Sequence, residues 1–278
     1  MGRIFDQPLE EVVKARYSVR TYANKPLGQE MVALLEDYIK TLSNPFGGEV
    51  AFKSAQAVNA KQLGTYGMIK GATHFIGATV KQSEGALESV GYAFERLILY
   101  AASLGLGTCW LGGTFNKGEF AKAMDVQKDT LFPAIAPVGW PEEKRIAERL
   151  MRLAVKADQR KTWKALFFQD GFSEPLTQAD AGAHAFPLEM LRLAPSASNK
   201  QPWRIVKAGN AFHFHEAKDP GYSDRLGFDI QRIDIGIAAC HFHLAALESG
   251  LNGEFQRTSP ALAGVPENTH YLFSWVSA

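Results

Sequence analysis

The sequence is poor in cysteine and has almost no net charge. Only two cysteines, Cys109 and Cys240, occur among 278 residues, which excludes a disulfide framework and a CxxC metal or redox motif. Thirty Lys and Arg residues balance 29 Asp and Glu residues, for a formal net charge of +1. Neither a nucleic acid nor a membrane surface is therefore indicated as a partner. So few cysteines suit a reducing compartment, and we expect a cytoplasmic protein.

Long hydrophobic runs are also absent. The most apolar stretch, residues 97–107, is too short to span a bilayer and follows Glu95 and Arg96. The N-terminal letters MGRIFDQPLEEVV lack a basic start followed by an apolar core, so we expect no secretory signal. Hydrophobic residues make up 46% and charged residues 21% of the chain, as in ordinary soluble proteins. The length allows one large domain or two modest ones.

The spacing of apolar residues predicts a mixture of helices and strands. The segment 10–22 starts as a helix and turns to extended chain. Further helices are predicted for residues 26–42, 89–107, 186–197 and 232–252, and strands for residues 71–80, 131–141, 203–209 and 211–217, the last two as a hairpin. The charged stretch 142–161 is interpreted as a helical linker.

The two long apolar helices match each other residue by residue. A shift of 145 residues, without a gap, pairs Gly91 with Gly236, Ala93 with Ala238, Leu99 with Leu244, Ala101 with Ala246, Gly105 with Gly250 and Leu106 with Leu251. Elsewhere the register drifts, as where Pro26 falls on Pro175. Two buried helices share small residues by composition alone, which is one explanation. The common order of elements favours the other, an old duplication.

The letters ARYSVRTY place Arg16, Ser18 and Arg20 at alternating positions. In an extended segment alternate side chains point the same way, so two cations and a hydroxyl would converge on a phosphate or a carboxylate. A solvated basic edge is the alternative interpretation of the same spacing.

The letters GLGTCWLGGTF, residues 105–115, do not form a dinucleotide-binding fingerprint. The third glycine is replaced by Trp110, and the segment follows a helix where the fingerprint would open one. What remains is a turn in which Gly112 and Gly113 allow the backbone to approach a flat ligand closely. A plain helix end followed by a turn would have the same sequence.

The histidines and cysteines of the sequence do not indicate a metal site or a catalytic thiol. His213 and His215 would share a strand face, whereas His241 and His243 on a helix would not. No third ligand has suitable spacing, so we predict no metal site. Cys109 has no histidine placed to activate it and is interpreted as a buried thiol.

Several segments together resemble the FMN-dependent nitroreductases. The Arg-x-Ser-x-Arg piece of that family is matched by residues 16–20, which we call the arginine segment. Its Ala-Pro-Ser-x-x-Asn-x-Gln-Pro-Trp loop is matched by residues 194–203, which we call the QPW loop. A helix ending in Leu-Gly-Leu-Gly-Thr-Cys-Trp and a Gly-Gly turn are matched by residues 104–113. Gly139-Trp140-Pro141 and Arg160-Lys161 stand where the family has a turn and a basic segment.

The order of these motifs departs from the family. Ordinary members carry the QPW loop soon after the arginine segment, where this chain has LSNPFGGEV, residues 42–50. Ordinary members are also homodimers whose flavin lies between subunits. The resemblance therefore implies a fused pseudo-dimer of the “putative TM nitroreductase” type. Its expected fold is α+β, a three-layer α/β/α arrangement of two degenerate tandem halves, residues 1–165 and 166–278. We expect a monomer with one flavin.

The resemblance also implies roles for individual residues. Arg16, Tyr17 and Ser18 would hold the FMN phosphate and ribityl chain with Arg160 and Lys161, and Arg20 would stabilise charge at the pyrimidine edge. Backbone amides of Leu111, Gly112 and Gly113 would approach flavin N5. The facing half would close the site with Pro195, Ser196, Ser198 and Asn199, backed by Trp203, and Thr65 would bond the ring.

The implied activity is ping-pong hydride transfer from NAD(P)H to a small-molecule electron acceptor such as a nitroaromatic or a quinone. No side chain is needed as general acid or base for the hydride transfer, because the flavin carries the chemistry. Two alternatives have the same sequence features: a protein that stores or senses FMN without turnover, and a structural protein whose flavin site is retired.

Overall fold

The computed structural model describes residues 4–56, 64–142 and 159–278. The described residues of the first half build an antiparallel sheet with strand order β1-β2-β4-β3 and four helices. The elements are α1 (Leu9–Ala15), α2 (Gln29–Lys40), β1 (Val50–Gln56), β2 (His74–Lys81), α3 (Ala86–Ser103), β3 (Gly107–Thr108), α4 (Lys117–Ala123) and β4 (Thr130–Gly139).

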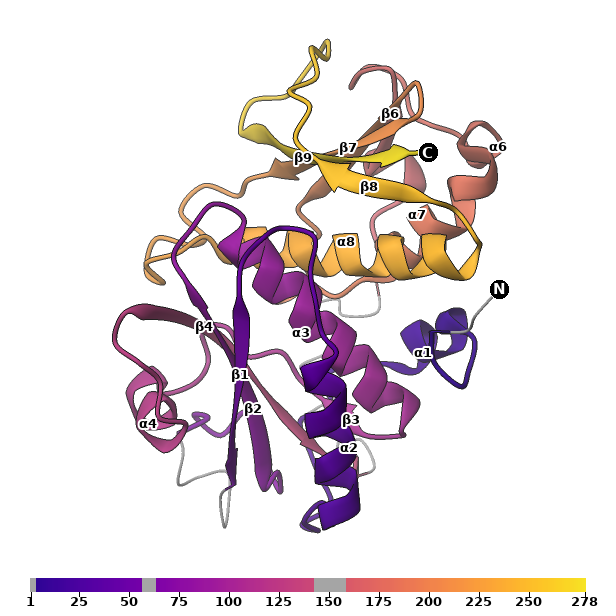
Figure 1. Cartoon of the computed structure of the whole chain (residues 1–278). Helices are drawn as coiled ribbons and strands as arrows, with labels where there is room; N and C mark the ends of the chain where they lie inside the picture. The colour runs from indigo at the N-terminus through magenta and orange to yellow at the C-terminus, as the bar shows by residue number, and fades with distance from the viewer. Residues whose placement is uncertain (1–3, 57–63, 143–158) are drawn as a thin grey trace.

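The central strands of the first sheet, β2 and β4, are buried on both faces. Along β2, Phe75 faces α4, where its ring lies 5.2 Å from that of Phe120. Its neighbours Ile76 and Ala78 face α3 and α2 on the other side. Because successive side chains of a strand point to opposite faces, a strand covered on both sides is apolar throughout, which explains the composition of the strand predicted for residues 71–80. This half therefore has helix, sheet and helix as its three layers (Figure 1).

The second half builds a five-stranded sheet with order β5-β6-β7-β9-β8, in which β5 runs parallel to β6 and the other pairs are antiparallel. The short helix η1 (Trp163–Ala165) comes directly before this half. The elements of the second half are β5 (Phe167–Gln169), α6 (Gln178–Ala181), η2 (Gly182–His184), α7 (Ala185–Leu193), η3 (Ala197–Asn199), β6 (Trp203–Ala208), β7 (Ala211–Ala217), α8 (Ile230–Glu248), β8 (Gly253–Gln256) and β9 (Thr269–Ser277).

The faces of the second sheet differ in character. Trp203, Phe212 and Trp275 point to the face that packs on α7 and α8 and are at most 1% exposed. The opposite face carries polar side chains, among them His213, whose ring nitrogen lies 2.6 Å from the hydroxyl of Ser274. Helices cover the first face, and loop segments pack against the second.

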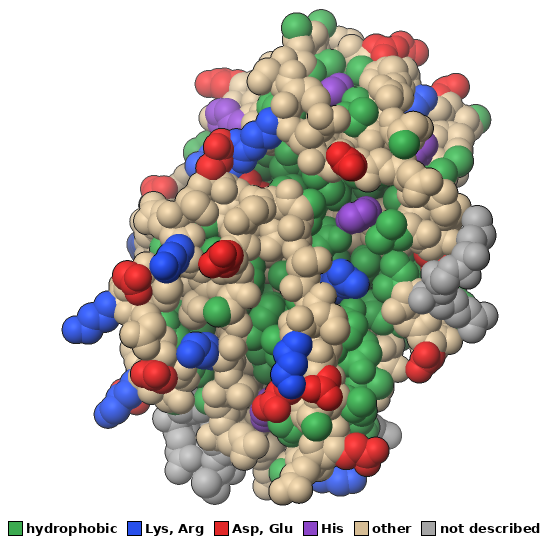
Figure 2. Space-filling model, viewed as in Figure 1, with side chains coloured by type: hydrophobic (Ala, Val, Ile, Leu, Met, Phe, Trp, Pro, Cys, Tyr) green, Lys and Arg blue, Asp and Glu red, His purple; other side chains and the backbone are tan. Residues whose placement is uncertain are grey.

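The long helices α3 and α8 pack against each other between the two sheets (Figure 1). In Figure 2 hydrophobic side chains gather along the seam between the halves, and charges of both signs are interspersed elsewhere on that face. Both helices are buried nearly all round, with Val90, Leu99, Ile235 and Phe242 fully covered. Their apolar composition follows from this central position.

The N-terminal helix α1 packs with the second half. Leu9, Val12 and Val13 belong to the hydrophobic core of α7, α8 and the second sheet. The carboxylate of Glu248 on α8 accepts hydrogen bonds of 3.1 and 3.2 Å from the backbone N–H of Leu9. The chain then returns to the first half, because Val19 N donates to Thr108 O of β3. The arginine segment therefore runs along the boundary between the halves.

Most predicted elements are confirmed, including the two long helices, the strands and the 203–217 hairpin. The helix predicted to open at Pro26 was placed too early: Gly28 is still extended, with ψ of 155°, and the helix begins at Gln29. Strands β1, β3, β5, β8 and β9 were not predicted. The predicted linker helix, residues 142–161, falls largely outside the described residues. Within the described part of the chain, no helix has the length and hydrophobicity needed to cross a membrane.

Candidate functional site

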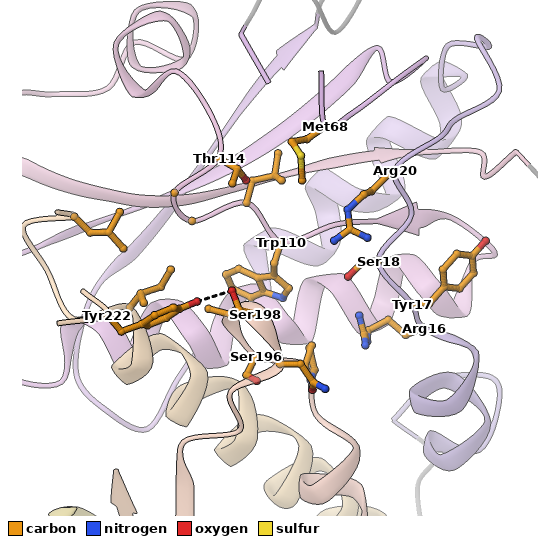
Figure 3. A pocket seen from close by; sticks show the side chains of 18 of the residues that line it. Arg16, Tyr17, Ser18, Arg20, Met68, Trp110, Thr114, Ser196, Ser198 and Tyr222 are labelled. Atoms are coloured by element: carbon orange, nitrogen blue, oxygen red, sulfur yellow. Dashed lines mark hydrogen bonds between the residues drawn. The ribbon is translucent and has the colours of Figure 1, made fainter. Parts of the chain in front are cut away.

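A cavity of about 1300 Å³ lies between the two halves (Figure 3). The first half lines it with the arginine segment, with Met68 and with residues 110–114. Arg160, near the end of the first half, also lines it. The second half contributes residues 195–199 of the QPW loop and, from the segment after β7, Gly221, Tyr222, Asp224, Arg225 and Leu226. The arginine segment and the QPW loop therefore meet at one cavity, although 174 residues separate Arg20 from Ala194 in the sequence.

The arginine segment is extended, as its alternating pattern predicts. Ser18 pairs with Thr108 and Thr21 with Lys70 in isolated parallel bridges. The side chains of Arg16, Ser18 and Arg20 point into the cavity in Figure 3, whereas the ring of Tyr17 is turned away from its centre. The backbone pairing thus fixes two cations and a hydroxyl on one wall.

The guanidinium of Arg20 is prepared for a ligand. Its Nε and Nη1 atoms are screened from solvent and have no hydrogen-bond partner among the described residues. Burying donors of a charged group without partners costs free energy. Such a group is retained where a bound molecule supplies the missing acceptors, and Arg20 lines the cavity where that molecule would lie.

The Gly-Gly turn brings backbone donors to the opposite wall. Leu111 exchanges two hydrogen bonds with Ile135 of β4, of 2.9 and 3.0 Å. The N–H of Leu111 is therefore engaged, which corrects the prediction that it would approach a ligand. The amides of Gly112 and Gly113 have no acceptor among the described residues. A Cβ on Gly112 would lie 2.5 Å from Ile230 Cδ1, so glycine there lets the halves approach closely.

The QPW loop has an unusual backbone. Ser198, Asn199 and Gln201 all have positive φ, between 47° and 55°, which residues other than glycine rarely adopt. Hydrogen bonds hold the conformation: Gln201 N donates to Ser196 Oγ at 2.9 Å, and Gln201 Oε1 accepts from Lys161 N at 2.8 Å. Trp203, fully buried in the second core, anchors the end of the loop. A buried tryptophan thus ends a loop that is otherwise rich in short polar residues.

Two predicted ligand residues lie outside the cavity lining. Lys161 directs its Nζ to the carbonyl of Gln201 at 3.3 Å, and burial with Arg204 nearby lowers its pKa to about 8. Thr65 is 2% exposed, and Met68 lines the cavity from the same segment. Arg160 lines the cavity as predicted, and it donates to Asn199 Oδ1 at 3.2 Å. The structure brings the remaining predicted residues together around the cavity.

Sequence reasoning missed the segment between β7 and α8. Tyr222 lies over the QPW loop, where its hydroxyl donates to Ser198 Oγ at 2.8 Å (Figure 3). Lys200 Nζ lies 5.2 Å from the centre of the Tyr222 ring. Asp224, Arg225 and Leu226 line the cavity next to it. These residues carry no motif, so nothing in the sequence signals their place.

A buried carboxylate behind the cavity wall was also missed. Glu95 of α3 is 0% exposed and accepts a 2.6 Å hydrogen bond from Trp110 Nε1. Its other oxygen lies 2.9 Å from His241 Nε2 and 3.8 Å from Arg16 Nε. His241 Nδ1 lies 3.1 Å from the carbonyl of Met190. Because a carbonyl only accepts, Nδ1 carries a proton, and a second proton must lie between Nε2 and Glu95.

The pseudo-symmetric position in the other half is filled with side chains. The shift of 145 residues carries Trp110 to Phe255 and Ile237 to Tyr92. Phe46, from the loop that stands where a QPW loop would, packs there, with its ring centre 5.3 Å from Phe255, 4.6 Å from Phe273 and 6.0 Å from Tyr92. The same fold position thus holds a cavity on one side of the seam and an aromatic cluster on the other.

The family described as “Putative TM nitroreductase” matches residues 8–246. Among solved structures, a putative nitroreductase from Thermotoga maritima MSB8 is similar over 99% of this chain and 96% of its own, with a TM-score of 0.62 and 18% identity. That likeness confirms the fold over both halves. No curated protein matches the chain.

Two further structures match about half of this chain. A nitroreductase family protein from Clostridium novyi NT covers 49% of this chain and 87% of its own, with a TM-score of 0.41 and 18% identity. A nitroreductase with bound FMN from Bacteroides fragilis NCTC 9343 covers 50% and 91%, also with a TM-score of 0.41 and 18% identity.

Proposed function

The chain belongs to the family described as “Putative TM nitroreductase”, and from this premise we propose that it is an FMN-dependent oxidoreductase that passes hydride from NADH or NADPH to a small-molecule acceptor such as a nitroaromatic or a quinone. One observation carries the proposal. The cavity between the halves is lined by Arg20, whose Nε and Nη1 atoms have no hydrogen-bond partner among the described residues, by Gly112 and Gly113, and by the serines of the QPW loop.

The residues present fit a flavin phosphate ester. Arg16 and Arg20 supply positive charge on one wall, with Ser18 between them as a hydroxyl donor. The amides of Gly112 and Gly113, which bond to no acceptor in the part of the chain that the structure describes, supply neutral donors for a heterocyclic edge. The volume of about 1300 Å³ is large even for cofactor sites, and it leaves room for a second molecule above the cofactor.

When bound, FMN supplies the chemistry of accepting and releasing hydride. The chain's own residues bind and orient it. Arg20 places a fixed cation in a partly desolvated wall, where it stabilises negative charge on a ligand more strongly than in water. The QPW loop, pinned by Gln201 and Trp203, presents Ser196 and Ser198 from the facing half. No side chain needs to act as a general acid or base for hydride transfer.

We further propose one flavin per chain and a monomer. Phe46, Tyr92 and Phe255 occupy the pseudo-symmetric position, and their rings leave no wall of cations and amides there. The packing of α3 on α8 already joins two halves, as a subunit interface would. Size-exclusion chromatography with light scattering tests this. A mass near 30.5 kDa is expected, and a dimer that persists on dilution would contradict it.

The first test of the function is the visible absorption spectrum of purified protein, with any released chromophore compared with FMN and FAD by chromatography. A yellow protein that releases about one FMN per chain and oxidises NADH or NADPH with a quinone supports the proposal. Bound FMN without turnover would favour a storage or sensor protein. A colourless protein that fails to take up added FMN would overturn the proposal and favour a retired site.

A further inference from the structure

A buried carboxyl group lies at the inner end of the cavity and has no role in the site described above. Asp234 stands on the second turn of α8 and is 2% exposed. It lines an inner chamber of about 130 Å³ that shares Arg20, Gly112 and Ser198 with the main cavity. The chamber therefore opens on the same space that the proposed cofactor would occupy.

The two oxygens of Asp234 have different surroundings. Oδ1 accepts a 2.9 Å hydrogen bond from the backbone N–H of Ala197 in the QPW loop. Oδ2 is screened from solvent and has no hydrogen-bond partner among the described residues. One oxygen thus holds the loop in place, and the other makes no hydrogen bond to the described residues, on a side chain that lines the chamber.

The neighbourhood of Asp234 favours its neutral form. The acidic groups that act on it are Glu216 of β7 and Asp229 at the start of its own helix, and the nearest turn of α3 offers Glu88, which is paired with Arg232. Burial, with Glu216 and Asp229 adding to it, raises the pKa of Asp234 well above its usual range. Because Oδ1 accepts from Ala197, the acid hydrogen belongs on Oδ2.

We propose that Asp234 donates a hydrogen bond from Oδ2 to an acceptor atom, a carbonyl oxygen or a ring nitrogen, at the edge of the planar ring system bound in the main cavity. The inference rests on the proposed function, because that ring is taken to be the flavin. A fixed neutral donor favours ring edges that present acceptors. It disfavours edges that present N–H groups, since a donor facing a donor leaves both unsatisfied in a buried place.

The residue at the position equivalent to Asp234 in the other half supports different roles for the two oxygens of Asp234. The shift of 145 residues carries Ser89 onto Asp234, and Ser89 Oγ accepts from Gly48 N at 3.0 Å. The hydroxyl of Ser89 donates to Gly85 O of its own helix at 2.9 Å. Holding the neighbouring loop thus requires a single oxygen in the half without a cavity. In the half with the cavity the side chain carries a second oxygen, and the residue lines the chamber.

Infrared difference spectroscopy, FMN-bound minus free protein, tests the proposal directly. A protonated carboxylic acid has its own carbonyl stretch, distinct from the carboxylate bands. We expect this band in the wild-type protein to shift to lower frequency when FMN binds and to be missing in Asp234→Asn. Carboxylate bands in its place, or an acid band that does not move, would overturn the proposal. A residue that only held Ala197 would give no shift on binding.

The affinity for FMN, measured by quenching of flavin fluorescence, gives a second readout. Asp234→Asn keeps an acceptor for Ala197 and a donor for the chamber, so its Kd should stay within about threefold of wild type. Asp234→Ala should weaken binding about tenfold, the value of one hydrogen bond. Ser89→Ala removes the equivalent loop contact in the other half and should leave the affinity unchanged. Equal affinities for wild type and Asp234→Ala would overturn the proposal.

The outcomes separate this inference from the proposed function. If the wild-type protein takes up no FMN, the proposed function fails. If wild type binds FMN while the acid band is absent or Asp234→Ala binds equally well, only the role of Asp234 fails. Should Asp234→Ala not fold, the infrared comparison of wild type with Asp234→Asn still decides the question.

Discussion

Gly91 of α3 and Gly236 of α8 lie against each other where the two helices cross. A Cβ on Gly91 would lie 2.1 Å from the carbonyl oxygen of Ile233 and 3.0 Å from Gly236 Cα. A Cβ on Gly236 would lie 2.2 Å from the carbonyl oxygen of Glu88. Glu88 and Ile233 are themselves 145 residues apart, so the contact is reciprocal. Such a self-complementary contact is the signature of a two-fold interface, here built within one chain.

This crossing predicts the effect of adding one methyl group. Gly→Ala inside a helix ordinarily stabilises by about 1 kcal/mol. Gly91→Ala should instead destabilise by about 2 kcal/mol or more, because the helices must separate to admit the methyl group. Urea unfolding measures the change. Gly118→Ala in α4 is the matched control, since its nearest neighbour would lie at 3.6 Å. If Gly91→Ala changed the free energy of unfolding no more than Gly118→Ala does, the close crossing of the helices would be contradicted.

The central helices and the extended arginine segment were predictable because their patterns are local. A helix that is apolar all round is buried, and alternate side chains of an extended segment share a side. The contributions of Glu95 and Asp234 were not predictable, because each depends on partners far away in the sequence, such as His241 for Glu95 and Ala197 for Asp234. The place of Lys161 was misjudged because its one-residue offset from Arg160 turns it toward Gln201.

Arg20→Met should weaken FMN binding without lowering the stability of the FMN-free protein. The variant keeps the aliphatic stem and removes a cation whose Nε and Nη1 atoms have no partner among the described residues. We expect FMN affinity to fall by about tenfold to a hundredfold, the value of hydrogen bonds to a charged group. The thermal midpoint of the FMN-free protein should hold or rise, because an uncompensated desolvation cost is removed.

Arg204→Met provides the contrast for Arg20→Met. The Nη1 atom of Arg204 donates to the carbonyls of Gln201 at 3.1 Å and Trp203 at 2.6 Å. Removing a cation that makes its hydrogen bonds should lower the thermal midpoint of the FMN-free protein. A fall of equal size in both variants would show that Arg20 is also paired within the protein.

The raised pKa of Glu216 leads us to expect that the stability of the fold depends on pH. Burial, with Asp229 as a lesser cause, raises its pKa to about 7 from 4.5. The folded state therefore binds more protons than the unfolded state between these values, and stability is lost as pH rises through 7. Between pH 5 and pH 8, Glu216→Gln should lose about 2 kcal/mol less unfolding free energy than wild type. Glu254→Gln, at an exposed position of β8, should follow wild type. Parallel curves for wild type and Glu216→Gln would refute this assignment.

Disrupting the aromatic cluster at the pseudo-symmetric position should lower the stability of the fold without creating a second FMN site. Phe46→Ala removes ring contacts to Phe255, Phe273 and Tyr92. We expect a loss of stability of about 2 kcal/mol for this partly buried ring. Equilibrium dialysis should still find about one FMN per chain, since the cations and amides of the proposed flavin site are not reproduced there. A second FMN bound by Phe46→Ala would show that the cluster only blocks an otherwise intact site.

Glu95 and His241 should form a pair without net charge behind the cavity wall, because the second proton lies between His241 Nε2 and Glu95. Glu95→Gln can still accept from Trp110 and donate to a neutral His241, so the fold should persist. The pair is neutral before and after this change, so the net charge near Arg16 stays the same. The midpoint potential of bound FMN should therefore stay within roughly 30 mV of wild type, the equivalent of about 1.4 kcal/mol. Glu95→Leu is the contrasting variant, expected to lose about 3 kcal/mol of stability because it leaves His241 and Trp110 without an acceptor. Dye-equilibrated redox titration measures the potential, and a larger rise in Glu95→Gln would show that Glu95 carries a charge that His241 does not balance.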